Sequence, residues 1–395
     1  ATYTPGNGAA RVEGSASPAH EALGEGAAPL PGVYVAHSKG DSMAIKIGLG
    51  LYPHLMTREN FAFAAQAGAT HVVAHLPGWA RRVGRGLPPD AMWTEDELAG
   101  LKHAMNEAGL EFYAIENFEV EHWYDVLLDG PRRDEQLANL QALLRTMGRL
   151  GISVMGYNFS YANVWGRVMG PYARGGARTP AYLAAEAPPE TPIPHGTVWG
   201  VQYDSGAPAG TIGEVSEEVL WDRYSRFVRD MIPVADEAGV RLAMHPADPP
   251  FGTLRNTARL VWKPEHYQRF FDLHASPNHC AEFCQGTVAE MNGEMSVYEA
   301  IAKYTAMGRI AYVHFRNVRG TVPNYIEEFV DSGDVDMVKA IRLYHRNGFD
   351  GVLIPDHAPE MTCPAPWHAG IAYTLGWMRA VVGIVEAEDP NSPIP

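Results

Sequence analysis

Four residues whose side chains commonly bind transition metals stand at the ends of β-rich runs in the second half of the chain. His245, Cys284 and Asp356 each end such a run, and His314 lies near the end of a fourth. Imidazole, thiolate and carboxylate groups together suit a divalent transition metal and leave room for substrate oxygens. Thiolate ligation argues against Mg²⁺ or Ca²⁺, because these ions prefer oxygen ligands. These residue types and positions predict a metal centre.

Each of these residues taken alone has a simpler structural explanation. A histidine in a strand is often a hydrogen-bonded core residue, and cysteine is a common small hydrophobic residue. Four metal-competent residues at four successive strand ends favour a metal site instead. Glu116 ends the third run and is a further candidate, either as a base next to the metal or as a polar residue of the rim.

Residues that follow these candidates extend the predicted site. Arg316 comes two residues after His314, which places it on the same face of the strand. An arginine there suits a bidentate contact with a substrate carboxylate, and a salt bridge to a carboxylate of the protein is the alternative. Three prolines within residues 245–250 would fix His245 in place at low entropic cost.

Eight short β-rich runs alternate with longer amphipathic stretches. The predicted strands are residues 45–51, 70–75, 110–116, 152–159, 240–245, 279–284, 310–316 and 351–356. The predicted helices are residues 58–67, 95–107, 134–149, 217–237, 334–346 and 373–386. This alternation is typical of an α/β fold of the (β/α)₈ TIM-barrel type. An open doubly wound sheet is the alternative, but the chain has neither G-x-G-x-x-G nor a Walker A sequence.

Two segments fall outside the repeating pattern. Residues 1–44 are rich in Gly, Ala, Pro and Ser and are predicted to be an N-terminal extension of a catalytic domain over residues 45–395. Residues 160–215 follow the fourth strand and are predicted to form a lid-like insertion. Catalytic groups of such barrels lie at the carboxyl ends of the strands, so this insertion belongs at the predicted site.

The composition limits the classes of function. The chain has 395 residues, of which 46% are hydrophobic and 19% charged, so it can build a large core. Its net charge of −15 disfavours nucleic acid or an anionic membrane as a partner, and no apolar run is long enough to span a membrane. Three cysteines and the absence of a secretory leader pattern suit a reducing compartment, so we expect a cytoplasmic protein. We also expect a homo-oligomer.

Seven motifs in this sequence resemble those of the D-mannonate dehydratases. They are YNF (157–159), the long segment SEEVLWDRYSRFVRDMIPVADEAGVRLAMHPADPP (216–250), FGTLRN (251–256), FCQGT (283–287), YVHFRNV (312–318), DVDMVKA (334–340) and PDH (355–357). The resemblance covers residues 115–357, and the order and spacing of the motifs together are specific.

The resemblance implies a fold, a reaction and roles for individual residues. It implies a xylose-isomerase-like TIM barrel that converts D-mannonate to 2-keto-3-deoxy-D-gluconate with loss of water. It implies Mn²⁺ or Fe²⁺ as the metal. Zn²⁺, Co²⁺ and Ni²⁺ are further options that the predicted ligand types leave open. The family's metal ligands fall on His245, Cys284, His314 and Asp356, and its catalytic histidine falls on His357.

The sequence also departs from the family pattern around the PDH motif. Ile354 and the pair Ala358–Pro359 replace arginine-containing flanks, and residues 324–331 lack the family's histidine. The family's catalytic tyrosine segment is replaced near residues 367–370, where His368 or Tyr373 can take the place of the tyrosine. Tyr325 and His368 are the candidates for a second acid or base. These departures predict altered contacts with the sugar acid.

The predicted reaction is β-elimination of water from a sugar acid. It needs a cation to stabilise negative charge, a base for the proton next to the carboxylate, and an acid for the leaving hydroxyl. His357 is the first acid/base candidate, and Arg316 and Asn317 are predicted to orient the acid. Tyr157, Asn158 and Glu116 complete the predicted substrate contacts. The alternatives are a metal-dependent sugar isomerase or epimerase and a non-catalytic binding protein on the same barrel.

Overall fold

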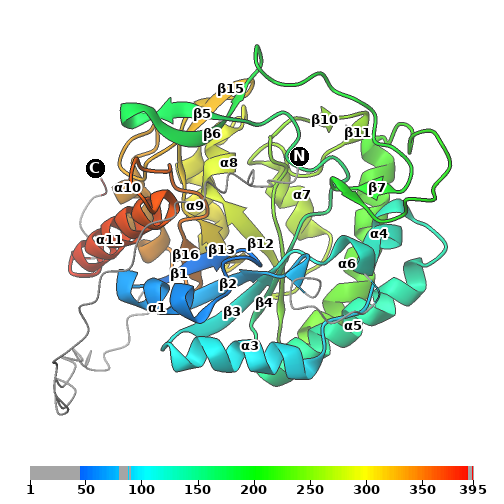
Figure 1. The fold of residues 1–395 in the computed structure, drawn as a ribbon, viewed down its shortest axis with the longest axis horizontal. Coiled ribbons are helices and arrows are strands. Elements are labelled where there is room, and N and C mark those ends of the chain that lie inside the picture. Colours follow the sequence, from blue (N-terminus) through cyan, green and yellow to red (C-terminus); the bar gives the residue numbers. More distant parts are fainter. Residues whose placement is uncertain (1–44, 80–87, 89, 390–393, 395) are drawn as a thin grey trace, which may run out of the picture. The chain divides into compact units, whose positions relative to one another are not determined.

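Eight parallel strands form a closed barrel in a computed structural model that describes residues 45–79, 88, 90–389 and 394 (Figure 1). The extension predicted over residues 1–44 lies outside the described residues. The order around the barrel is β1-β16-β13-β12-β9-β4-β3-β2. The strands are β1 (Lys46–Leu51), β2 (His71–His75), β3 (Glu111–Glu116), β4 (Val154–Tyr157), β9 (Arg241–Met244), β12 (His279–Cys284), β13 (Ile310–His314) and β16 (Val352–Ile354). Each of the eight predicted strands is confirmed.

Helices surround the barrel in Figure 1, and all six predicted helices are present. The helices are α1 (Arg58–Ala67), α3 (Glu95–Glu107), α4 (Val120–Leu128), α5 (Arg133–Leu150), α6 (Glu217–Ala238), α7 (His266–Asp272), α8 (Gln285–Glu290), α9 (Val297–Ala306), α10 (Met337–Arg346) and α11 (Pro366–Glu386). In the described part of the chain, none of them combines the length and apolar composition needed to cross a membrane.

Local chemistry explains where these helices begin and end. Thr94 and Glu97 form a reciprocal capping box that starts α3, and Gly151 and Gly239 end α5 and α6 in the left-handed conformation that glycine adopts easily. Two predicted helix starts were wrong. α10 begins three residues later than predicted because Asp336 caps it, and α11 begins seven residues earlier, where Pro366 occupies its first turn.

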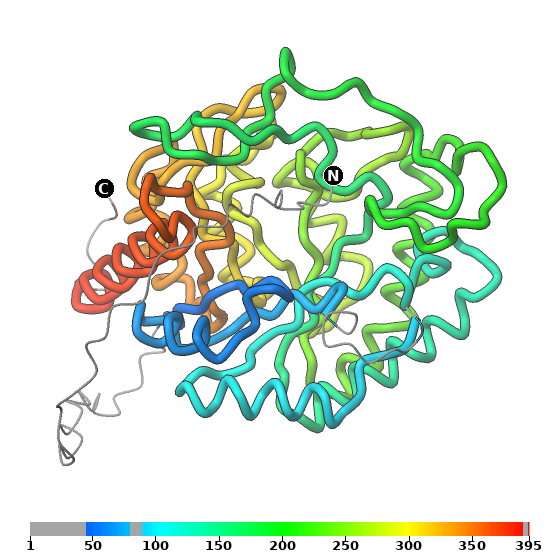
Figure 2. The backbone as a smooth tube through the Cα atoms, in the orientation of Figure 1, coloured from blue at the N-terminus to red at the C-terminus, as the bar shows by residue number. Residues whose placement is uncertain are grey.

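The segment predicted as a lid-like insertion joins a small antiparallel sheet. β5 (Val168–Ala173) and β6 (Ala177–Leu183) come from this insertion, and β14 (Asn317–Thr321) and β15 (Asn324–Glu328) form a hairpin after β13. The sheet order is β14-β15-β6-β5, so segments far apart in sequence lie side by side (Figure 2). Four shorter strands follow in two further hairpins, β7 (Thr197–Val198) with β8 (Val201–Gln202) and β10 (Thr253–Leu254) with β11 (Thr257–Ala258).

The core has two layers, one on each side of the barrel strands. A small cluster of buried residues that includes Tyr113, Val154 and Tyr312 forms one layer, and a much larger apolar cluster joins residues of the strands and the helices. Because side chains alternate along a strand, every barrel strand except β1, which has Gly48 and Gly50 at the alternate positions, contributes to both layers. This packing makes the strand ends a rigid platform for functional side chains.

Candidate metal centre and active site

The predicted metal ligands meet at the carboxyl ends of adjacent strands. Ligand atoms of His245, Cys284 and His314 all lie within 4.8 Å of one another. Cys284 ends β12 directly opposite His314 at the end of β13, and His245 follows the last residue of β9. Oδ2 of Asp356, just beyond β16, lies 3.5 Å from Nδ1 of His314. We call these four residues the ligand cluster.

The chemistry of the ligand cluster fits a transition metal. Burial alone would raise the pKa of the Cys284 thiol, but the charge of Arg316 and hydrogen bonds with His245 and His314 outweigh burial and hold this pKa well below its usual value. A thiolate is the form of cysteine that binds metals. Asp356 has a φ of 58°. This left-handed conformation is unfavourable for residues other than glycine and is often found at functional sites. Nitrogen, sulfur and oxygen donors together suit a divalent transition metal.

Two buried glutamates contact the other nitrogen of His314. Nε2 of His314 lies 3.2 Å from Oε2 of Glu116 and 3.2 Å from Oε1 of Glu282. The second oxygen of Glu116 lies 3.2 Å from Nε2 of His75. A carboxylate on the far nitrogen of an imidazole orients the ring and turns its other nitrogen toward the metal. Glu116, predicted as a substrate contact, thus lies where it orients a candidate ligand.

Sequence reasoning missed His75 and Glu282. His75 ends the second β-rich run, so the strand-end rule applied to the other candidates would have found it. Glu282 lies inside β12 and carries no such signal, although alternation places it on the same face as Cys284. Burial and the nearby charge of Glu116 raise the pKa of Glu282 to about 8. Glu282 is therefore mostly protonated at neutral pH, and Glu116 carries the negative charge of the pair.

His357 lies next to the ligand cluster and is held by a glutamate. Nδ1 of His357 is 2.8 Å from Oε2 of Glu327, and Nε2 is 3.5 Å from Oδ1 of Asp356. Burial lowers the pKa of His357 to about 4 and outweighs the opposing charge of Asp356. The imidazole is therefore neutral at neutral pH, which is the form that a general base requires. Sequence reasoning missed Glu327, which lies on β15.

Arg316 is enclosed by carboxylates. Its guanidinium, 1% exposed, forms ion pairs with Glu290 at 3.3 Å and Asp356 at 3.6 Å, and it also contacts Glu327. Nη2 of Arg316 lies 3.4 Å from Sγ of Cys284. This arrangement matches the alternative from the sequence, a salt bridge within the protein, and it explains the low pKa of the Cys284 thiol.

Arg167, a second buried arginine, comes from the insertion after β4 and was missed by sequence reasoning. Nη1 of Arg167 lies 3.2 Å from Oδ2 of Asp248, and the guanidinium also contacts Glu327. Oδ1 of the same Asp248 accepts a hydrogen bond from the Tyr325 hydroxyl at 3.3 Å. Burial raises the pKa of Tyr325 well above its usual value, so the hydroxyl stays protonated. Tyr325 thus belongs to the same network as His357.

Three predicted site residues lie apart from the ligand cluster. The Tyr157 hydroxyl lies 2.9 Å from that of Tyr224 on α6, so this side chain faces the helices. The Asn317 amide donates to the carbonyl oxygen of Val335 at 3.0 Å and holds a loop. Nε2 of His368 on α11 lies 3.0 Å from Oδ1 of Asn60 on α1. Within the described ranges, no side-chain hydrogen bond of these three residues reaches the ligand cluster.

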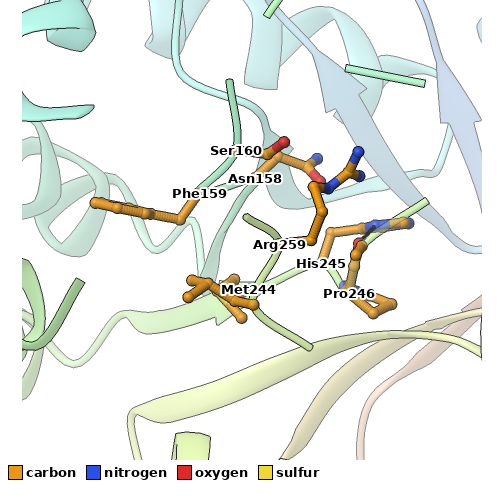
Figure 3. A pocket seen from close by; sticks show the side chains of 9 residues that line it. Asn158, Phe159, Ser160, Met244, His245, Pro246 and Arg259 are labelled. Atoms are coloured by element: carbon orange, nitrogen blue, oxygen red, sulfur yellow. Dashed lines mark hydrogen bonds between the residues drawn. The ribbon is translucent and has the colours of Figure 1, made fainter. Parts of the chain in front are cut away.

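A small pocket adjoins the ligand cluster at the ends of β4 and β9 (Figure 3). The lining residues are Asn158, Phe159, Ser160, Met244, His245, Pro246, Ala247, Arg259 and Leu260. The predicted substrate contact Asn158 therefore lies in this pocket, where its amide also donates to Oδ1 of Asn117 at 3.0 Å. Because His245 belongs to both, a group bound in the pocket lies next to the ligand cluster.

The barrel and the ligand cluster together define a (β/α)₈ enzyme with a candidate metal centre at its strand ends. The model of the D-mannonate dehydratase (UxuA) family matches residues 60–177 and 210–388, which is more than half of the chain. Mannonate dehydratase 2 of Halalkalibacterium halodurans is 31% identical over 279 residues, covering 67% of this chain and 79% of that protein. The chain belongs to the mannonate dehydratase family and is a carbon–oxygen lyase.

Further relatives and solved structures agree with this family and fold. The mannonate dehydratase of Lactococcus lactis subsp. cremoris is 26% identical over 327 residues, covering 76% of this chain and 89% of that protein. The crystal structure of mannonate dehydratase from Streptococcus suis serotype 2 matches with a TM-score of 0.70 at 22% identity, covering 88% of this chain and 97% of that one. A xylose isomerase domain protein from Alicyclobacillus acidocaldarius shares the fold with a TM-score of 0.56 at 13% identity, covering 86% and 100% of the two chains.

Proposed function

We propose that this protein uses a divalent metal to eliminate water from a sugar acid and releases a 2-keto-3-deoxy acid. The observation that carries the proposal is the ligand cluster, in which four metal-competent side chains meet at the ends of four adjacent strands. The sugar-acid substrate is supported by the relatives from H. halodurans and L. lactis, which are named mannonate dehydratases.

His245, Cys284, His314 and Asp356 would hold the metal. The family resemblance favours Mn²⁺ or Fe²⁺, and the mixture of imidazole, thiolate and carboxylate also suits Zn²⁺, Co²⁺ or Ni²⁺. When bound, such a cation supplies a Lewis acid that stabilises negative charge developing on the substrate oxygens. Arg316 compensates the buried negative charges around it.

His357 is the proposed base. As the C2–H bond breaks, Nε2 of His357 takes the proton, while its Nδ1–H donates to Glu327 and fixes the tautomer. The C3–O bond breaks as the leaving hydroxyl receives a proton from Tyr325, whose hydroxyl lies in the same network. The hydroxyl leaves as water with the Tyr325 proton, and an enol remains. The proton that His357 took from C2 then restores the Tyr325 hydroxyl, and the enol tautomerises to the 2-keto acid. His368 contacts α1 and takes no part in this proposal.

The residues that flank the PDH motif support a substrate preference that differs from that of the family. Ile354, Ala358 and Pro359 stand where the family pattern has arginine-containing flanks, so contacts that an arginine makes with a carboxylate are lost there. The insertion over residues 160–215 is proposed to form a wall or lid of the active site. This role is supported by Arg167, which contacts Asp248 and Glu327. We expect weaker turnover of D-mannonate than of another sugar acid or derivative.

A product screen tests the proposed function. The full-length protein is incubated with Mn²⁺ and a panel of aldonic and uronic acids, and products are detected as semicarbazones of 2-keto-3-deoxy acids and by mass. We expect at least one acid to lose one water, and the reaction to stop when the metal is chelated. A product of unchanged mass would support the isomerase or epimerase alternative, and no product from any acid would contradict the proposal.

A further inference from the structure

Arg259 is a buried guanidinium with no carboxylate partner among the described residues. The residue is 3% exposed, and its Nη atoms donate only to the backbone oxygens of Asn163, at 3.2 Å, and Asp248, at 2.9 Å. Nε of Arg259 has no hydrogen-bond partner. Burial lowers the pKa of Arg259 to about 10, so the group still carries its charge at neutral pH.

This isolation distinguishes Arg259 from the other two buried arginines near the site. Arg167 and Arg316 each pair with carboxylates of the protein, so their charges are compensated inside the fold. A buried charge without a counterion is strongly unfavourable, and proteins keep one mainly where a ligand supplies the opposite charge. The charge of Asp248 acts on Arg259, but the Asp248 carboxylate forms its ion pairs with Arg167 and Arg316. Arg259 therefore has no ion-paired anion of its own among the described residues, and a ligand can supply one.

The pocket in Figure 3 offers a place for that anion. Arg259 lines it together with Ser160 and Asn158, and His245 forms another part of the lining. The Ser160 hydroxyl is buried and has no hydrogen-bond partner, so a second polar group also lacks a ligand. The pocket is small, so only an end group of a larger molecule could approach these two polar groups.

We propose that Arg259, Ser160 and Asn158 form an anion subsite that binds the carboxylate of the sugar acid. The subsite rests on the proposed function for the identity of its ligand. Since His245 belongs to both the pocket and the ligand cluster, a carboxylate bound there has the adjacent carbon next to the ligand cluster. A guanidinium binds a carboxylate through two parallel hydrogen bonds, and its charge also stabilises the negative charge that grows on that carboxylate as C2 is deprotonated.

The probe for this subsite must bind without reacting. The acid 3-deoxy-D-arabino-hexonate keeps the carboxylate of D-mannonate and lacks the 3-hydroxyl that would leave. The corresponding alditol, 3-deoxy-D-arabino-hexitol, has the same carbon chain and no charge. Calorimetric titration of both compounds into the full-length, Mn²⁺-loaded protein separates recognition of the carboxylate from recognition of the hydroxyl groups.

Arg259→Gln should weaken binding of the hexonate by about 10- to 100-fold, because a charged hydrogen-bonding partner is lost. Binding of the hexitol should stay within about twofold. Arg259→Lys should recover part of the loss, and Ser160→Ala should weaken hexonate binding by about 3- to 10-fold. Equal hexonate affinity in wild type, Arg259→Gln and Ser160→Ala would overturn the subsite.

Arg255→Gln is the matched control. Arg255 is another buried arginine four residues away, but it donates to the carbonyl of Thr191 at 2.7 Å, lies over the Trp165 ring and does not line the pocket. The affinity of Arg255→Gln for the hexonate should stay within about threefold of the wild-type affinity. A wild-type protein that fails to bind the hexonate overturns the subsite as well. Binding that depends on Arg259 in a protein that dehydrates no sugar acid would instead overturn the proposed function alone.

Discussion

At the scale of single residues, the site depends on how buried charges compensate one another. Arg316 lies beside Sγ of Cys284 and among four acidic side chains, so one cation stabilises both a thiolate and the acidic residues around it. Such a network tolerates the loss of a member poorly, because the remaining charges are left buried and unpaired. Informative substitutions at the site are therefore those that keep the shape of the side chain and remove only one of its chemical properties.

Cys284→Ser should remove tight metal binding from a protein that still folds. The hydroxyl of serine is not deprotonated at neutral pH, so the cluster loses its soft anionic donor and its metal preference changes. Cys280→Ser is the matched control, since Cys280 is a buried cysteine of the same strand that donates to the Pro277 carbonyl. The metal content of both variants, measured by elemental analysis after dialysis, tests the assignment. Wild-type metal affinity in Cys284→Ser would place the metal elsewhere.

His357→Asn should lower kcat by about two to four orders of magnitude and leave the metal content unchanged. Glu327→Gln should lower kcat less, because it removes only the group that fixes the His357 tautomer. His368→Asn is the comparison, since His368 was the other predicted acid/base histidine and contacts α1. Near-normal turnover in His357→Asn, or a larger loss in His368→Asn, would reverse the two roles.

At the scale of elements, the strands and most helices were predictable from the sequence because apolar periodicity and glycine caps are local signals. The strand-end rule of the barrel then placed His245, Cys284, His314 and Asp356 correctly beside one another. The small sheet was not predictable, because β6 pairs with β15 across more than 140 positions of the chain. Arg167 and Glu327 depend on that pairing, so the sequence pattern could not reveal them.

Ala181→Pro should disrupt the small antiparallel sheet and leave the metal centre of the barrel intact. Ala181 is buried in the central strand β6, opposite Ile326 of β15, where a proline cannot donate to the hydrogen bonds between the strands. Turnover should fall strongly because Glu327 and Arg167 lose their positions, while the metal content stays at one equivalent per chain. Ala181→Ser keeps the backbone N–H and is the control. Full activity in Ala181→Pro would show that the sheet does not position the site.

At the scale of the whole molecule, the free energy of unfolding should decrease at acidic pH because His279 is buried. Burial, reinforced by the charge of Arg309, lowers the pKa of His279 to about 3, against about 6.5 in an unfolded chain. Below about pH 6.5 the unfolded chain takes up a proton that the folded protein does not, so the free energy of unfolding decreases by up to about 1.4 kcal/mol per pH unit.

His279→Gln should remove this contribution. Urea unfolding at pH 8 and pH 5.5 should show a smaller loss of stability on acidification in His279→Gln than in wild type. His103→Gln is the control, because the His103 side chain is 74% exposed, and it should lose as much stability as wild type. An unchanged pH dependence in His279→Gln would mean that other groups set the acid sensitivity.

The whole molecule combines a family barrel with a rim of its own, so its reaction class and its substrate are separate questions. The ligand cluster, His357 and the family membership all concern the elimination chemistry, whereas Ile354, Ala358, Pro359 and the Arg259 pocket concern which acid is bound. Efficient turnover of D-mannonate, with kcat/KM at or above about 10⁴ M⁻¹s⁻¹, would refute altered specificity and leave the elimination chemistry intact.

The most direct test of the account is a metal titration of the metal-free, full-length protein with product formation as the readout. Using the best sugar acid from the screen, formation of the 2-keto-3-deoxy acid should rise linearly with added Mn²⁺ and reach its plateau at one equivalent per chain. Cys284→Ser should show neither the plateau nor the product, and Cys280→Ser should match wild type. Product formation that continues at full rate in the metal-free protein, or in Cys284→Ser, would contradict the account.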